Sequence, residues 1–173
     1  MTDVDRLFRT YNAQLVRYLT RRLGDSDLAE EVAQETFVRA MRQDEIVNER
    51  AWLFAVATNL LRDAARRQER ERKHLTLLAA ESRVSSEDAD VEAELSVERL
   101  RQSAAARRAL GALGDRDRSA LLMKEEGLSY PEIAEALALS AGSVGTTVAR
   151  ARRRLVEAYE ELEGQGERND AAS

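Results

Sequence analysis

Several residue types on which enzymes depend are scarce or absent. The chain has no cysteine among its 173 residues, which excludes disulfides, thiolate zinc sites and cysteine nucleophiles. Its one histidine, His74, lies in the basic run RERERKHL, so neither a histidine metal cluster nor a Ser-His-Asp arrangement can be assembled. We therefore expect no catalytic residue, no metal site and no cofactor.

Sheet-forming residues and long apolar runs are also rare. Aromatic residues make up 5% of the chain and there is one proline, a balance typical of helical proteins rich in Ala, Leu, Glu and Arg. No segment approaches the roughly 18 apolar residues of a membrane span, and the start, MTDVDRLF, lacks the basic region of a signal peptide. We expect an all-α cytoplasmic protein with no membrane insertion.

Charge is distributed unevenly along the chain, whose net charge is −5. Residues 81–98 carry seven acids against one basic residue, whereas 62–73 (RDAARRQERERK) and 150–154 (RARRR) are basic. Two separate basic stripes fit a protein that touches DNA at two places, although basic helix faces also occur in proteins that never bind nucleic acid.

Helical periodicity divides the chain into two small helical domains joined by an acidic flexible linker. Residues 1–78 form the first domain, in which Gly24 ends one helix and Ser26 or Asp27 caps the next. In its last helix Trp52, Val56 and Leu60 share one side. The linker covers 79–99, the second domain 100–160, and the tail 161–173 is expected to be disordered.

The segment 127–155, GLSYPEIAEALALSAGSVGTTVARARRRL, predicts a helix-turn-helix. Ser129 and Glu132 have capping-box spacing, and after the break ALALS, Ser140 can cap a second helix near Ala141. At 100° per residue one side of that helix is apolar, comprising Val144, Val148, Ala151 and Leu155. The other side carries small residues and then arginines, namely Gly142, Thr146, Ala149, Arg150 and Arg153. This suits a recognition helix in the DNA major groove.

The residues alone leave two other interpretations open. A classical DNA-binding regulator would share the helix-turn-helix, but it would usually dimerise and no heptad seam is visible, so we expect a monomer. A helical adaptor protein without a DNA role would carry the basic stripes incidentally.

Three segments together resemble a known family. DLAEEVAQETFVRA resembles the polymerase-binding helix of extracytoplasmic-function (ECF) sigma factors, RAWLFAVATNLLRDAARR resembles their promoter-melting helix, and both precede the helix-turn-helix in the family's order. The resemblance implies an alternative sigma factor that binds core RNA polymerase, reads a duplex upstream promoter element and holds the melted non-template strand. It also implies an anti-sigma factor as a partner.

The resemblance implies roles for individual residues. The polymerase-facing helix would use Asp27, Glu30, Glu31, Gln34 and Glu35. Promoter DNA would be contacted by residues of the melting region, namely Asn48, Arg50, Trp52, Asn59, Arg62, Arg66 and Arg67, and by residues of the recognition helix, namely Ser143, Thr146, Thr147, Arg150 and Arg153. For Trp52 the apolar stripe favours a place in the core. Gly145 and Thr147 stand where many relatives carry cations, which predicts weaker phosphate contact and a different promoter preference.

Overall fold

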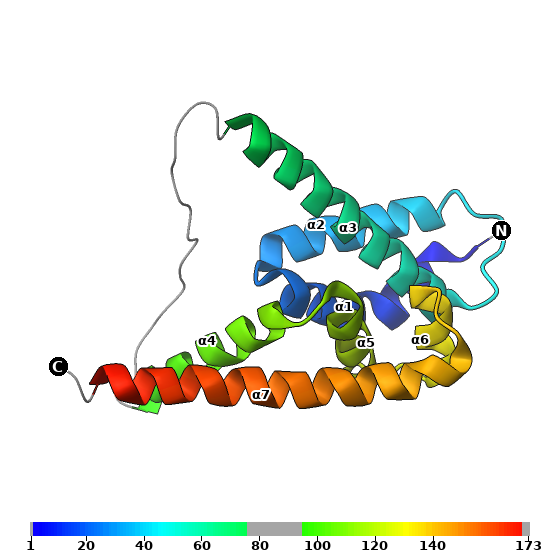
Figure 1. The fold of residues 1–173 in the computed structure, drawn as a ribbon. Coiled ribbons are helices and arrows are strands. Elements are labelled where there is room, and N and C mark those ends of the chain that lie inside the picture. Colours follow the sequence, from blue (N-terminus) through cyan, green and yellow to red (C-terminus); the bar gives the residue numbers. More distant parts are fainter. Residues whose placement is uncertain (1, 76–94, 171–173) are drawn as a thin grey trace.

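A computed structural model of the chain describes residues 2–75 and 95–170. The described residues form α1 (Val4–Leu23), α2 (Ser26–Ala40), α3 (Glu49–Leu75), α4 (Leu95–Ala112), α5 (Asp115–Glu125), α6 (Tyr130–Leu137), the short 3-10 helix η1 (Ala141–Ser143) and α7 (Val144–Asp170). Figure 1 shows α1–α3 packed together as an N-terminal bundle, with α4–α7 beside them as a C-terminal bundle. The all-α prediction is confirmed for the described residues, none of whose helices is long and apolar enough to cross a membrane.

The turn between α1 and α2 is set by two local signals. Gly24 adopts the left-handed conformation (φ 70°) and its N–H donates to the Thr20 carbonyl, as its position predicts. The cap of α2 is Asp25, whose side chain accepts from the backbone N–H of Leu28. The prediction of Ser26 or Asp27 as this cap was wrong by one or two residues, because Asp25 is the last residue with an extended backbone and the helix has already begun at Ser26.

The core of the N-terminal bundle lies where α1, α2 and α3 meet. Its buried side chains are Leu7, Leu15, Tyr18, Leu19, Val32, Ala33, Phe37, Leu53, Phe54, Ala57 and Leu61. The Tyr18 hydroxyl pairs with the Thr58 hydroxyl at 2.8 Å, so these two buried hydroxyls are satisfied. The buried face of α3 therefore includes Phe54. Trp52, which was expected near the middle of this face, is only half-buried and lies at the edge of the core.

The helix-turn-helix is built as its sequence predicts at α6. Ser129 and Glu132 form both hydrogen bonds of a capping box, and α6 ends at Ala138, which adopts the left-handed conformation (φ 51°). The Ser140 side chain makes no capping hydrogen bond, because a 3-10 turn intervenes and α7 begins only at Val144. The predicted apolar side of α7 is confirmed: Val144, Val148 and Ala151 are buried and Leu155 is half-buried.

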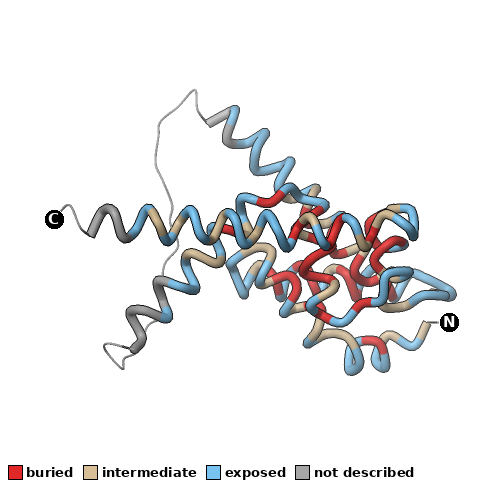
Figure 2. Tube along the Cα trace, turned by 60° about the horizontal axis from the view of Figure 1, so that its bottom comes forward, coloured by how far each residue is buried: buried red, intermediate tan, exposed pale blue. Residues whose placement is uncertain are grey.

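The ends of the predicted linker and tail differ from expectation. Helix α4 begins at Leu95, inside the segment 79–99, and the rest of that segment up to residue 94 lies outside the described residues. Residues 161–170, expected to be disordered, continue α7, because the half-buried stripe of Leu155, Tyr159 and Leu162 runs on past residue 160 and α7 packs along α4. Buried residues gather where the two bundles meet, whereas the outer turns of α3 that the structure describes are exposed (Figure 2).

Candidate nucleic-acid interface

The 3-10 helix η1 and the first turns of α7 present a narrow surface of small side chains. Gly142, Thr146 and Ala149 are exposed, and Ser143 is half-buried with its hydroxyl donating to the Ser140 carbonyl at 2.9 Å. Thr147 does not belong to this surface: it is buried, and its hydroxyl donates to the Ser143 carbonyl at 2.8 Å. Its assignment as a DNA contact is therefore corrected, since residue 147 lies 100° from Thr146, on the side that packs inward.

Gly145 faces Tyr130 across the turn between α6 and α7. A Cβ built at this position would lie 3.4 Å from the ring of Tyr130, the first residue of α6. A Cβ at that distance would make an ordinary van der Waals contact, so the packing against α6 does not require a glycine here. The sequence showed only the helix propensity that the glycine costs.

The arginines of α7 differ in what they contact. Arg150 donates from Nε (2.9 Å) and Nη2 (2.5 Å) to the two oxygens of Asp117 on α5, and Arg154 approaches the same carboxylate at 3.4 Å. Asp117 is buried, and the hydrogen bond from Arg150 holds the pKa of its carboxyl below the ordinary value. Arg153 is exposed and makes no ion pair with the part of the chain that the structure describes.

Asp117, which holds Arg150 and Arg154 in place, was not indicated by the sequence. It lies in the first turn of α5, where an acid is expected for the helix dipole alone. Its partner Arg150 is 33 residues away, which no local pattern reveals.

The predicted polymerase-binding face of α2 is solvent-accessible. Asp27, Glu30, Glu31 and Gln34 are exposed, and Glu35 is half-buried and accepts from Arg39 at 2.9 Å. The residues share one helix and form a row of acidic and amide groups, which a basic protein surface can contact.

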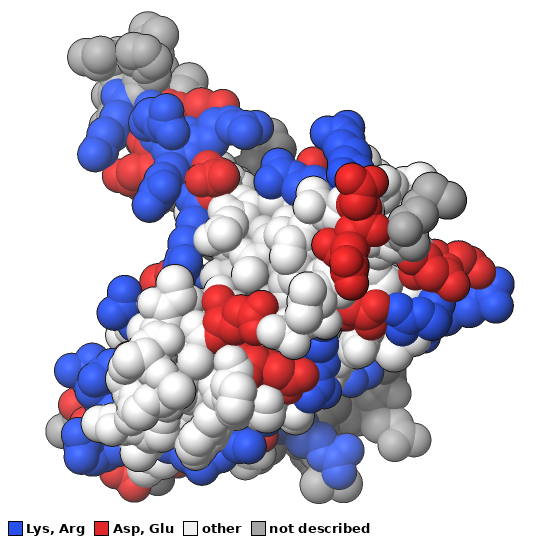
Figure 3. Space-filling view, turned by 90° about the vertical axis from the view of Figure 1, so that its right-hand side faces the viewer, with Lys and Arg blue, Asp and Glu red and all other residues white. Residues whose placement is uncertain are grey.

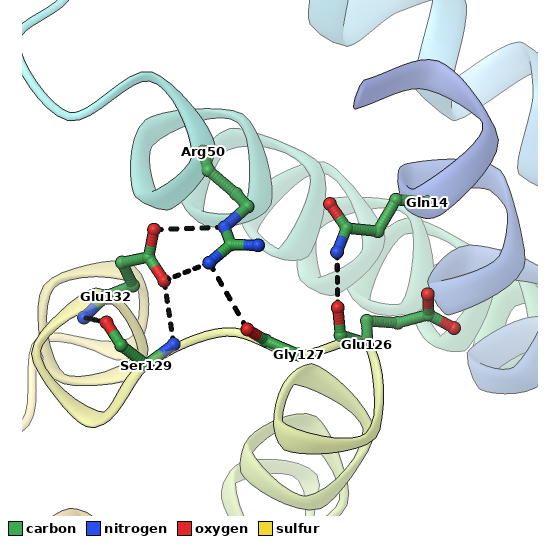
Figure 4. A network of polar contacts seen from close by, with 6 residues as sticks. All are labelled: Gln14, Arg50, Glu126, Gly127, Ser129 and Glu132. Carbon is green, nitrogen blue, oxygen red and sulfur yellow. Dashed lines mark hydrogen bonds and ion pairs between the residues drawn. The ribbon is translucent and has the colours of Figure 1, made fainter. Parts of the chain in front are cut away.

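The loop before α3 and the start of α3 contact the helix-turn-helix directly. Asn48 donates to the Glu135 carboxylate at 2.6 Å. Arg50 donates to the Glu132 carboxylate from Nε at 2.9 Å and from Nη2 at 2.6 Å, and it also donates to the Gly127 carbonyl at 3.2 Å (Figure 4). The hydrogen bond from Arg50 is the main reason why the pKa of Glu132 lies below its ordinary value.

Further along α3 the basic residues change from paired to exposed. Arg62 donates from Nε to Asp115 at 2.8 Å, whereas Asn59, Arg66 and Arg67 are exposed. Basic side chains predominate at the exposed end of α3, at the top in Figure 3, with acidic side chains among them, and further acidic groups lie nearer the centre of that face.

Helix α1 supplies further contacts that the sequence did not indicate. Arg17 and Arg21 both bind the nearly buried carboxylate of Glu126, at 3.0 and 3.2 Å, and Gln14 donates to the Glu126 carbonyl (Figure 4 shows Gln14). Arg22 binds Asp115 beside Arg62. Burial alone would raise the pKa of the Asp115 carboxyl, but Arg62 and Arg22 lower it below the ordinary value.

Each of the two bundles contains a segment that matches a known protein family. Residues 7–71 match sigma-70 region 2, and residues 103–155 match sigma-70 region 4. These two regions in this order define a sigma-70-type initiation factor of bacterial RNA polymerase.

Curated relatives narrow the class further. The ECF RNA polymerase sigma factor SigE of Mycolicibacterium smegmatis is 33% identical over 159 residues, which are 90% of this chain and 61% of that protein. RNA polymerase sigma factor YlaC of Bacillus subtilis is 31% identical over 160 residues, covering 88% of this chain and 90% of YlaC. The chain belongs to the ECF sigma factors, which bind core RNA polymerase, recognise promoter DNA and initiate transcription.

Solved structures share the fold. The sigma factor RpoE of Bartonella quintana, in complex with the anti-sigma factor NepR, aligns with a TM-score of 0.66 at 22% identity over 92% of this chain and 98% of RpoE. CnrH, in complex with the cytosolic domain of CnrY, aligns with a TM-score of 0.61 at 24% identity over 91% of this chain and 88% of CnrH. The family identification confirms the resemblance and excludes the adaptor and classical-regulator alternatives.

Proposed function

We propose a division of labour between two domains, residues 1–78 and 100–160. The first domain binds core polymerase through the acidic face of α2 and holds the melted non-template strand with the loop before α3 and with α3 itself. The second domain reads the duplex upstream element with the start of α7. The observation that carries this proposal is the exposed, uncharged face of Gly142, Thr146 and Ala149 followed by the exposed Arg153, a surface that fits a major groove.

The roles assigned to Asn48, Arg50 and Arg62 require the two bundles to separate. In the closed arrangement these three side chains hold carboxylates of the C-terminal bundle. They become available to DNA only when those contacts are released. The exposed Asn59, Arg66 and Arg67 need no such release.

The protein acts in the cytoplasm, as a monomer when free and without an active site of its own, and an anti-sigma factor holds it inactive. Support for the last point is that the RpoE structure of similar fold is a complex with an anti-sigma factor. If the anti-sigma factor is added to the chain before core polymerase, transcription should fall. If it is added after the holoenzyme has formed, transcription should fall less. Equal inhibition in both orders would contradict this role.

The polymerase-binding face is tested with the double variant Glu31→Lys/Glu35→Lys. It should weaken binding to core polymerase at least tenfold in a titration, because two charges on the contact row are reversed. The matched control, Glu160→Lys/Glu161→Lys, reverses two charges on α7 and should bind like the wild type. Equal affinity of the two variants would show that the assigned face is wrong.

The upstream-reading face is tested with Arg153→Ala. Duplex affinity should fall and the slope of log affinity against log salt should decrease by about one, as for one lost phosphate contact. Arg108→Ala, which removes an exposed arginine of α4, serves as control and should leave the slope unchanged. A slope unaltered by Arg153→Ala would assign this residue to solvent.

A further inference from the structure

The polar contacts between the two bundles all run in one direction. Among the described residues, every hydrogen bond that crosses the boundary has its donor in the N-terminal bundle and its acceptor in the C-terminal bundle. The donors are Gln14, Arg17, Arg21, Arg22, Asn48, Arg50 and Arg62, and the acceptors are Asp115, Glu126, the Gly127 carbonyl, Glu132 and Glu135. The hydrogen-bonding groups of one bundle are therefore cationic or amide donors and those of the other are mostly carboxylates, although Arg118 of α5 also lies close enough to Arg22 for their charges to repel.

The cationic donors converge on shared anions. Arg17 and Arg21 meet at Glu126, and Arg22 of α1 and Arg62 of α3 meet at Asp115. Within the described part of the chain, none of these four arginines has an ion pair in its own bundle. Without the C-terminal bundle, each pair would be left as two like charges that converge on one point, an arrangement that favours a bound anion.

One of these arginines also has an unused donor. The Arg22 side chain is only 5% exposed, and its Nε is buried without a hydrogen-bond partner. A single carboxylate at Asp115 does not satisfy the whole guanidinium. A phosphate offers more acceptor oxygens than a carboxylate, and arginine binds both with the same forked geometry.

We propose that the arginine face, defined as Arg17, Arg21, Arg22, Arg50 and Arg62, binds the phosphate backbone of opened promoter DNA, and that the carboxylates of Asp115, Glu126 and Glu132 occupy it as substitutes for phosphates while the bundles are closed. This gives the arginines of α1 a role in DNA binding. It also means that in the closed arrangement the C-terminal bundle covers the DNA-binding face of the N-terminal bundle. The inference rests on the proposed role of the first domain in holding the melted strand.

The masking is tested on the full chain with Asp115→Asn/Glu126→Gln/Glu132→Gln. Glutamine at 132 can retain the capping box, so α6 should still form. Without polymerase and at low salt, this unmasked variant should bind a single-stranded oligonucleotide at least tenfold more tightly than the wild type. Its radius of gyration, measured by X-ray scattering, should also increase. The control Glu157→Gln/Glu160→Gln/Glu161→Gln has the same net charge and should change neither quantity.

The binding face is tested by adding Arg17→Gln/Arg21→Gln to the unmasked variant. The salt slope for single-stranded DNA should fall by about 1.4, because each lost phosphate contact contributes about 0.7. Adding Arg9→Gln/Arg108→Gln, which removes two exposed arginines outside the face, should leave the slope unchanged. An equal slope with and without Arg17 and Arg21 would overturn the assignment of the face.

Two further outcomes remain informative. If the unmasked variant behaves like its charge-matched control, the masking is refuted. If circular dichroism shows that the triple variant is unfolded, the single variant Glu126→Gln must give a smaller increase of DNA affinity in the same direction, and no increase overturns the proposal. Because these assays use neither polymerase nor duplex, their failure is distinguishable from failure of the tests at Glu31, Glu35 and Arg153.

Discussion

Asp115 and Asp117 lie two residues apart at the start of α5, yet they serve different contacts. The Asp117 side chain is 6% exposed and binds Arg150 and Arg154 within its own bundle. The Asp115 side chain is 44% exposed and binds Arg22 and Arg62 of the other bundle. The same chemistry thus stabilises a single bundle where the carboxylate is buried, and joins the two bundles where water and other anions have access to the carboxylate.

The largest expected effect comes from removing the inner carboxylate. Asp117→Ala should lower the free energy of unfolding by about 2 kcal/mol, because hydrogen bonds between a buried carboxylate and two arginines are lost. Asp115→Ala should lower it by less, because the Asp115 carboxylate is 44% exposed and separation of the two bundles returns the buried Arg22 to water. Urea denaturation followed by circular dichroism measures both. Equal losses for the two variants would remove the distinction between them.

Glu132 takes part in both kinds of contact, with Ser129 inside its bundle and with Arg50 across the boundary between the bundles. Glu132→Gln can keep the cap and should leave the free energy of unfolding within about 0.5 kcal/mol while raising affinity for single-stranded DNA. Glu132→Ala should raise that affinity equally and also cost about 1 kcal/mol of stability. If both variants lose the same stability, the capping role is not separable from the contact with Arg50.

Acidification should weaken both sets of contacts in one pH window. The pKa values of Asp115, Asp117 and Glu132 are lowered in the folded protein. A carboxyl with a lowered pKa stabilises the folded state above its ordinary pKa, near 4, and this contribution is lost as the pH falls below that value. Denaturation midpoints should therefore fall below about pH 4 and change little from these groups between pH 6 and 8. In Asp115→Asn/Glu132→Gln the acid-induced fall should be smaller, and an identical pH profile would contradict the assignment.

Local signals made much of the fold predictable. The capping box of Ser129 and Glu132, the left-handed Gly24 and the apolar stripe from Val144 to Ala151 all act within a few residues, so the sequence displays them directly. The cap of α2 was missed narrowly, because Asp25, Ser26 and Asp27 are all good capping residues in consecutive positions.

The candidate site was less predictable, because its contacts are between distant residues. Arg50 and Glu132 are 82 positions apart, and Arg17 and Glu126 are 109 apart, so periodicity places each on a helix face without identifying its partner. Thr147 was misplaced for a geometric reason, since it lies at the edge between the two faces of α7 and its hydroxyl bonds back to the helix backbone. The roles of the polymerase-facing and DNA-facing residues stay predictions.

We expect the two bundles to mask each other in the free protein and to separate when the chain engages promoter DNA. Because the chain has no cysteine, dyes can be attached at Arg9→Cys on α1 and Glu125→Cys on α5, both exposed, and followed by single-molecule energy transfer. We expect one high-transfer population for the free chain and a low-transfer population once core polymerase and a pre-opened promoter are added. High transfer that persists in the transcribing complex, or low transfer in the free chain, would contradict it.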